Sequence, residues 1–113
     1  MSEREGRPVG WLWFEAGEIE RCMNRDEVMD VGLYQGTWHK FRIGNLLRDI
    51  RDQPITEESL ELYEHLTRMA VRVQNKEAEI RGIRGHINSD SEKQDRRLRR
   101  LHRAIQSKIA EQA

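Results

Sequence analysis

The stretch TEESLELYEHLTRMAVRVQNKEAEIRGIRGHINSD, residues 56–90, makes up almost a third of the chain and decides its fold. It contains no proline, and its glycines come only near its end. Thr56 is a plausible N-cap, because its hydroxyl can accept a hydrogen bond from a backbone N–H of the first turn. Glu57 and Glu58 occupy that turn, where the helix dipole favours negative charge. The stretch therefore predicts a long helix over residues 57–85.

Apolar side chains recur along this helix at alternating spacings of four and three residues, which is the pattern of a coiled-coil seam with Lys76 as its one interruption. A helix over residues 57–85 would be about 45 Å long at the usual rise per residue. We expect a rod of this length to exceed what the rest of the chain can cover, so that its seam must face another helix. The seam consists of Leu62, Leu66, Met69, Val73, Ile80, Ile83 and Ile87.

A second amphipathic helix is predicted at about residues 90–111, where Leu98, Leu101 and Ile105 lie along one stripe. Two arrangements remain open. The second helix folds back on the first seam as a helical hairpin, or the two segments form one interrupted helix that runs on through the glycines. A hairpin alone buries little apolar surface, so we expect self-association or a constitutive partner.

Pro54 divides the chain into two parts of different composition. All three tryptophans and both phenylalanines precede it, and Tyr63 is the only aromatic residue that follows. The sequence therefore predicts a flexible start at residues 1–8, a compact aromatic head at residues 9–53, and a helical hairpin or coiled-coil tail at residues 55–113. The predicted fold is mainly α, with a small aromatic-rich helical head followed by an α-helical hairpin or coiled-coil stalk.

Within the head, the apolar run VGWLWF at residues 9–14 fits a strand or the start of a helix. Residues 24–27 fit a capping box that would begin a short helix, closed by Gly32. Thr37 is a candidate N-cap for the next helix. These elements predict a small helical core around the aromatic side chains.

Composition narrows the class of protein. Hydrophobic residues make up 36% of the chain and charged residues 35%, a mixture that suits exposed amphipathic helices better than a thick core. The single cysteine, Cys22, cannot form an internal disulfide and indicates a reducing compartment. No apolar run approaches the length of a membrane span, and the start has no signal-peptide pattern. We expect a cytoplasmic protein without membrane contact.

No pattern of catalytic or metal-binding residues stands out. The histidines lack histidine or cysteine neighbours at the spacing of a zinc site. The many glutamates follow no recognised loop or motif, and acids commonly solubilise a helix face. We therefore expect no enzymatic activity, no metal and no cofactor.

Charge is unevenly distributed along the chain. Residues 1–30 carry four basic and eight acidic side chains, whereas residues 81–113 carry nine basic and four acidic ones. This polarity predicts head-to-tail contact between copies, or a basic tail that binds an anionic partner.

Residues 24–43 fit a helix-turn-helix pattern with basic residues on the outward part of its second helix, although the acidic residues in its first helix would repel the phosphates of DNA. The predicted nucleic-acid contacts are His39, Lys40, Arg42, Arg48, Arg96, Arg97, Arg100 and Arg103.

The leading functional prediction is a non-catalytic, self-associating protein-interaction module. It would be an adaptor, an assembly component or an inhibitor of a larger machine, of the compact kind that phages and mobile elements carry. Trp11, Trp13 and Trp38 are its candidate protein-binding aromatics, because tryptophan dominates such surfaces. The alternative is a DNA-binding regulator or packaging-type protein with a helix-turn-helix head and a coiled-coil oligomerisation stalk. Taking the two predictions together, the expected partners are a second copy of the chain, a larger protein or both, with nucleic acid as the partner in the alternative.

Overall fold

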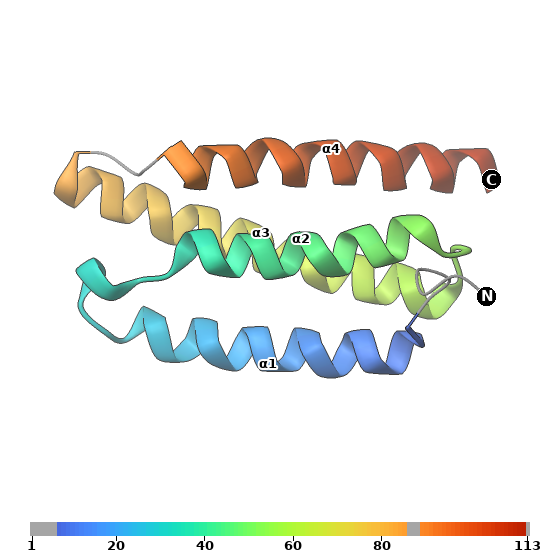
Figure 1. The fold of residues 1–113 in the computed structure, drawn as a ribbon, viewed down its shortest axis with the longest axis horizontal. Coiled ribbons are helices and arrows are strands. Elements are labelled where there is room, and N and C mark those ends of the chain that lie inside the picture. Colours follow the sequence, from blue (N-terminus) through green and yellow to red (C-terminus); the bar gives the residue numbers. More distant parts are fainter. Residues whose placement is uncertain (1–6, 86–88, 113) are drawn as a thin grey trace.

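The computed structural model describes residues 7–85 and 89–112 (Figure 1). Within them the chain is mainly α, as predicted, with four α-helices, one short 3₁₀ helix and no strand. The elements are α1 (Val9–Glu27), the 3₁₀ helix η2 (Val31–Leu33), α2 (Gly36–Asp52), α3 (Glu57–Arg84) and α4 (Ser89–Gln112).

Successive helices run in opposite directions along the molecule (Figure 1). Helix α2 contacts each of the other three helices, and α3 also contacts α1. Helices α1 and α4 lie on opposite sides, with α2 and α3 between them. The molecule is elongated, measuring 44 × 24 × 24 Å. The arrangement is thus an antiparallel four-helix bundle in which α2 occupies the central position.

One hydrophobic core joins the four helices. Each helix contributes apolar side chains spaced three and four residues apart, which places them on one face. These faces meet in a single cluster of buried side chains. The core consists of Leu12, Ala16, Ile19, Met23, Ile43, Leu46, Leu47, Ile50, Leu62, Tyr63, Leu66, Met69, Val73, Leu98, Leu101 and Ile105.

Helix α1 differs from the predicted head. The apolar run at residues 9–14 opens a helix that continues without a break to Glu27. The capping box predicted at residues 24–27 is therefore wrong, because these residues form the last turn of α1 rather than the first turn of a new helix. Asp26 belongs to the buried face of that turn, so tertiary contacts decide its environment.

Helix α3 begins and ends where the local signals place it. Thr56 accepts a hydrogen bond from the backbone of Ser59, and Ser59 in turn accepts from the Thr56 backbone, which completes a capping box. Gly85 ends the helix with a φ of 88°, a left-handed conformation that costs glycine little. The chain then reverses direction into α4 (Figure 1). The single interrupted helix is thus excluded, and α3 and α4 form the predicted hairpin.

The premise that the α3 seam is too long for its own chain to cover is wrong, whereas self-association stays a prediction. Leu62, Leu66, Met69 and Val73 are buried within one chain, because α1 and α2 both pack against α3. The middle of the seam is therefore covered by two helices of its own chain. Residues of the predicted head and tail therefore share one core.

The far end of the seam behaves differently from its middle. Ile80 is buried, whereas Ile83 is 64% exposed. Ile87 lies outside the described residues. The charged residue that interrupts the apolar seam is also one position later than predicted. Glu77 is the buried one, whereas Lys76 pairs with Glu79 near the surface. The spacing from Val73 to Glu77 to Ile80 is four and three, so a buried acid takes a seam position.

Of the helices in residues 7–85 and 89–112, none combines the length and the apolar character needed to cross a lipid bilayer.

Candidate functional site

A buried ionic cluster joins α2, α3 and α4 around Lys40. The Lys40 side chain is 0% exposed. Its Nζ donates to the Ser91 carbonyl and to Asp95 Oδ1, each at 2.9 Å, and it forms a short ion pair with Glu77. Ser91 Oγ donates to Glu77 Oε2 at 2.6 Å, and it is also hydrogen-bonded to the Thr37 hydroxyl. One ammonium thus holds the start of α4 and the last turns of α3 against α2.

The cluster fixes the register of three helices. A buried charge is tolerated only when partners replace its lost hydration, and Lys40 has three oxygen partners from two other helices. The backbone at Gly36 approaches Glu77 closely, since a Cβ there would lie 2.6 Å from Glu77 Oε2. The cluster is therefore structural, and its main effect is on helix placement.

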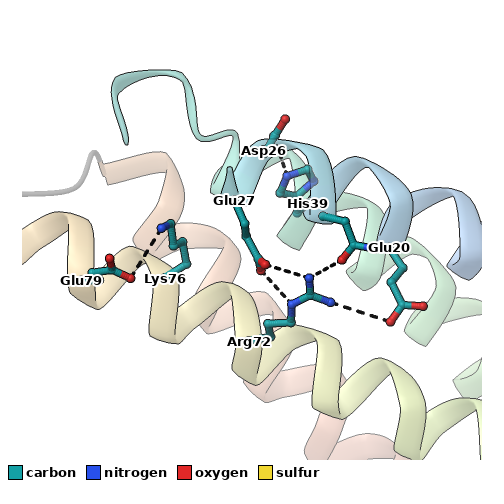
Figure 2. Close-up of polar contacts among 8 residues, drawn as sticks. Glu20, Asp26, Glu27, His39, Arg72, Lys76 and Glu79 are labelled. Atoms are coloured by element: carbon teal, nitrogen blue, oxygen red, sulfur yellow. Dashed lines mark hydrogen bonds and ion pairs between the residues drawn. The ribbon is translucent and has the colours of Figure 1, made fainter. Parts of the chain in front are cut away.

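A second buried polar pair links α1 to α2. His39 Nε2 donates to Asp26 Oδ2 at 2.8 Å, and the two side chains are 1% and 3% exposed. Figure 2 shows this pair beside the last turn of α1. Asp26 also accepts from the Gln35 backbone, and the Tyr34 ring meets the His39 ring edge to face. The pair therefore closes the short connection between the two helices.

Burial lowers the pKa of His39, because the interior disfavours the imidazolium, although the hydrogen bond and charge of Asp26 act in the opposite direction. In the unfolded chain the imidazole takes up its proton near its ordinary pKa of about 6.5. The contribution of His39 to the free energy of unfolding is thus fully present above about pH 6.5. It falls as the pH drops below this value, since the imidazole of the unfolded state gains the proton first.

We expect the loss at His39 to reach at most about 1.4 kcal/mol per pH unit. Urea unfolding of the wild type and of His39→Gln at about pH 7.5 and about pH 5.5 measures it, and the wild type should lose more stability between the two. Identical losses in the two proteins would show that His39 binds its proton equally well in both states.

Arg72 connects α3 to the last two turns of α1 (Figure 2). Its Nε and one terminal nitrogen donate to the two carboxylate oxygens of Glu27, at 2.7 and 2.8 Å. The same guanidinium donates to Asn24 and lies 3.8 Å from Glu20. The hydrogen bond to Glu27 raises the pKa of Arg72. These contacts orient α1 on α3 in a partly exposed position, where ion pairs contribute little stability.

An apolar groove of about 310 Å³ lies between α3 and α4. Leu47 of α2 forms part of its lining, together with Ala70 from α3 and Leu98 from α4. Arg99, His102 and Arg103 line it from the α4 side, whereas Thr67, Val71 and Gln74 line it from the α3 side. Most of the lining is apolar, and its charged members are basic.

Hydrogen bonds between side chains join α3 and α4 at both ends of this groove. The Tyr63 hydroxyl is hydrogen-bonded to His102 and accepts from Gln106 at 2.9 Å. Gln74 donates to Asp95 at 3.4 Å. Long polar side chains thus connect the two helices where their backbones do not pack closely, and the groove lies between these bridges.

The outer face of α2 carries an exposed aromatic pair next to arginines. Trp38 is 51% exposed, and its ring stacks on Phe41 at 5.5 Å. The Arg97 guanidinium of α4 lies 5.4 Å from the Phe41 ring centre and donates to Asn45 Oδ1 at 2.8 Å. A Cβ at Gly44 would lie 2.6 Å from Arg97, so glycine admits this close approach. We call Trp38, Phe41 and Arg97 the aromatic platform.

The other predicted aromatic residues lie elsewhere. Trp11 is 61% exposed near the start of α1 and meets Phe14 edge to face at 6.3 Å. These two rings line a hollow of about 430 Å³ with Pro8 and Gly10. Trp13 is half-buried and packs on His65 of α3 at 5.4 Å. The structure thus separates Trp11 from Trp13, which lie on different faces of α1.

The predicted nucleic-acid residues do not form one surface. His39 and Lys40 are buried, so the prediction that they face outward is wrong: both point toward acidic partners in the interior. The helix-turn-helix interpretation thereby loses two of its contact residues.

The remaining predicted arginines are distributed between α2 and α4. Arg48, Arg97 and Arg100 are close enough that burial, followed by the charges of Arg48, Arg100 and Arg51, lowers the pKa of Arg97. Arg42 is half-buried on α2, Arg96 is exposed on α4, and Arg103 lies at the groove.

Sequence reasoning missed the partners of Lys40 and the groove between α3 and α4. Glu77, Ser91 and Asp95 lie 37 to 55 residues from Lys40 in the sequence, so no local pattern joins them. The one available signal is the spacing of Glu77, which continues the apolar seam from Val73. Phe41 was assigned to the core with the other aromatics, but it lies on the surface.

In the part of the chain that the structure describes, no group of three or more histidine, cysteine, aspartate or glutamate side chains is arranged to hold a metal ion. Comparisons with protein-family models, with curated proteins and with solved structures find no match for this chain.

Proposed function

We propose that this protein is a non-catalytic protein-interaction module whose groove between α3 and α4 receives an amphipathic helix with acidic flanks from a partner protein. One observation carries the proposal: the groove has an apolar lining that includes Leu47, Ala70 and Leu98, and Arg99 and Arg103 line it on the α4 side. An apolar channel with basic residues beside it favours a ligand that combines apolar anchors with carboxylates.

The dimensions of the groove support a helical occupant. Its α3 side runs from Thr67 to Gln74, a distance of about 10 Å at the rise of an α-helix. In a partner helix, anchor residues at positions i, i+3 or i+4, and i+7 span the same length. Val71, which lines the groove on the α3 side, is 48% exposed and so presents apolar surface to a ligand. A helix laid between α3 and α4 would therefore insert one row of side chains.

The charge of the groove lining determines which kind of partner helix it favours. The lining residues of the groove include no carboxylate, and among the described side chains neither Arg99 nor Arg103 belongs to an ion pair. Acidic flanks would find cations on the α4 side, whereas basic flanks would be repelled. The proposed partner is thus an acidic amphipathic helix rather than a basic one.

Self-association is no longer needed to explain the long helix, because α1 and α2 cover the seam. The proposal therefore places a partner at the groove and not at the seam. An adaptor, an assembly component and an inhibitor are all compatible with a groove of this kind.

A labelled model peptide tests the proposal. The peptide carries leucines at i, i+3 and i+7 with glutamates on both flanks, and its twin has lysines in place of the glutamates. Fluorescence anisotropy should show the acidic peptide binding at least about tenfold more tightly than the basic one. Ala70→Trp, which fills the groove, should abolish binding.

Two charge-reversed proteins locate the site. Arg99→Glu combined with Arg103→Glu should weaken binding of the acidic peptide by about tenfold or more, while Arg100→Glu, on the same helix but outside the groove lining, should leave it nearly unchanged. Equal binding of the two peptides, or full binding by Ala70→Trp, would refute the groove as the site.

A further inference from the structure

We propose that the aromatic platform of Trp38, Phe41 and Arg97, with Arg48 and Arg100 beside it, binds single-stranded nucleic acid by stacking of bases and pairing with phosphates. This surface lies on α2 and α4, and none of its residues lines the groove between α3 and α4. The inference is therefore independent of the proposed function.

The platform is already arranged for stacking. Trp38 and Phe41 lie one turn apart on α2, and their rings are stacked with an interplanar angle of 22°. Trp38 is half-exposed, so its ring is accessible from solvent. A hollow of about 410 Å³ adjoins the pair and is lined by Thr37, Trp38, Phe41, Asp90, Lys93 and Gln94. Stacking on such rings tolerates any base, because every base has a π-face.

Arg97 is held rigidly beside the rings. It donates to the Phe41 carbonyl at 3.2 Å and to Asn45 at 2.8 Å, and its guanidinium lies over the Phe41 ring. Arginine in this position can stack on a base and present charge to the backbone of the same strand. The side chain therefore needs little ordering when a ligand binds.

Positive charge surrounds the platform. Arg48 lies one turn after Asn45, which binds Arg97, and Arg100 lies one turn after Arg97 on α4. Burial, followed by the charges of Arg48, Arg100 and Arg51, lowers the pKa of Arg97. None of the ion pairs formed among the described side chains involves Arg48 or Arg100. Arginines gathered in this way are relieved of mutual repulsion when phosphates bind. Asp90 at the hollow is acidic, so the phosphate path runs along the arginine side.

The geometry favours single strands over a duplex. In a duplex the bases are stacked on one another, and only their edges reach a protein surface. The platform offers ring faces, which need unstacked bases. His39 and Lys40, which a helix-turn-helix contact with duplex DNA would use, are buried.

Titration of the full chain with a fluorescein-labelled oligothymidylate about 16 nucleotides long tests the inference. The expected result is binding that quenches tryptophan fluorescence, with an affinity that falls steeply between about 50 mM and about 200 mM salt. A duplex of the same length should bind at least about tenfold more weakly. Trp38→Leu should weaken oligothymidylate binding by about tenfold and remove most of the quenching. Its matched control, Trp11→Leu, should keep both the affinity and the quenching, since Trp11 is at least as exposed as Trp38 and lies on another helix.

Arginine variants separate this surface from the groove. Arg48→Gln combined with Arg100→Gln should reduce the salt slope by about 0.7 for each lost phosphate contact, and Arg99→Gln combined with Arg103→Gln should leave it unchanged. Polyglutamate serves as a polyanion without bases. If it competes as well as the oligonucleotide, the surface is a site for acidic protein segments and the inference is wrong. Equal affinity for duplex and single strand, or no binding at the lower salt concentration, also overturns it.

Discussion

Replacing Lys40 with methionine is expected to lower the free energy of unfolding by about 3–5 kcal/mol. Methionine fills a volume similar to that of lysine, so the loss of stability comes from removing the positive charge and not from a cavity. Glu77 and Asp95 would be left facing each other beside the buried space that the ammonium occupies. Since a small domain has only about 5–15 kcal/mol of stability in total, chemical unfolding monitored by circular dichroism should show a large fall in midpoint.

Neutralising the partners provides the control for this substitution. The triple variant Lys40→Met, Glu77→Gln, Asp95→Asn removes all three charges and should recover much of the lost stability, because no unpaired charge remains in the interior. A fall of less than about 1 kcal/mol in Lys40→Met alone would mean that the cluster is hydrated and contributes little.

Leu66→Ala is expected to cost about 2–5 kcal/mol, because the leucine is fully buried in the core that all four helices share. The melting temperatures of both the variant and the wild type should be independent of protein concentration, since the contacts of Leu66 lie within one chain. A seam between chains would instead make the melting temperature rise with concentration. Thermal melts over a hundredfold range of about 1 to 100 µM distinguish the two cases.

Ile83 supplies the matched control on the same helix. It continues the spacing of the seam, yet it is 64% exposed. Ile83→Ala should therefore change stability by no more than about 0.5 kcal/mol. A concentration-dependent melt, or a large loss in Ile83→Ala, would show that α3 pairs with a second molecule and would restore the predicted coiled coil between chains.

The two proposed surfaces lie on different sides of α4, and each uses its own arginines. Arg99 and Arg103 face the groove beside α3, whereas Arg97 contacts α2 at the aromatic platform. On the two proposals, the arginines of α4 would serve two separate faces of one helix. Each face acts as the control surface for the other, so that failure of one proposal leaves the other standing.

The amino-acid sequence by itself determined the helical class and the bounds of α3, because the signals that set them are local. Apolar spacing of three and four residues marks the buried face of each helix. Thr56 begins α3 through its hydroxyl, and Gly85 ends it through a left-handed backbone. These features act over a few residues, so they can be recognised before the fold is known. They predicted the mainly α class, and they offered the reversal between α3 and α4 as one of two open arrangements.

Only the tertiary structure decided what each face meets. The spacing of Leu66 and its neighbours shows that a face is apolar, but it does not say which helix covers it. Lys40 carries the local signature of a surface residue, yet it is buried because Glu77 and Asp95 arrive from distant helices to replace its hydration. Phe41 and Trp38 carry the signature of a core, yet they remain outside because α2 already turns Ile43, Leu46 and Ile50 inward. Burial depends on the sum of long-range contacts, and helical periodicity contains no information about these.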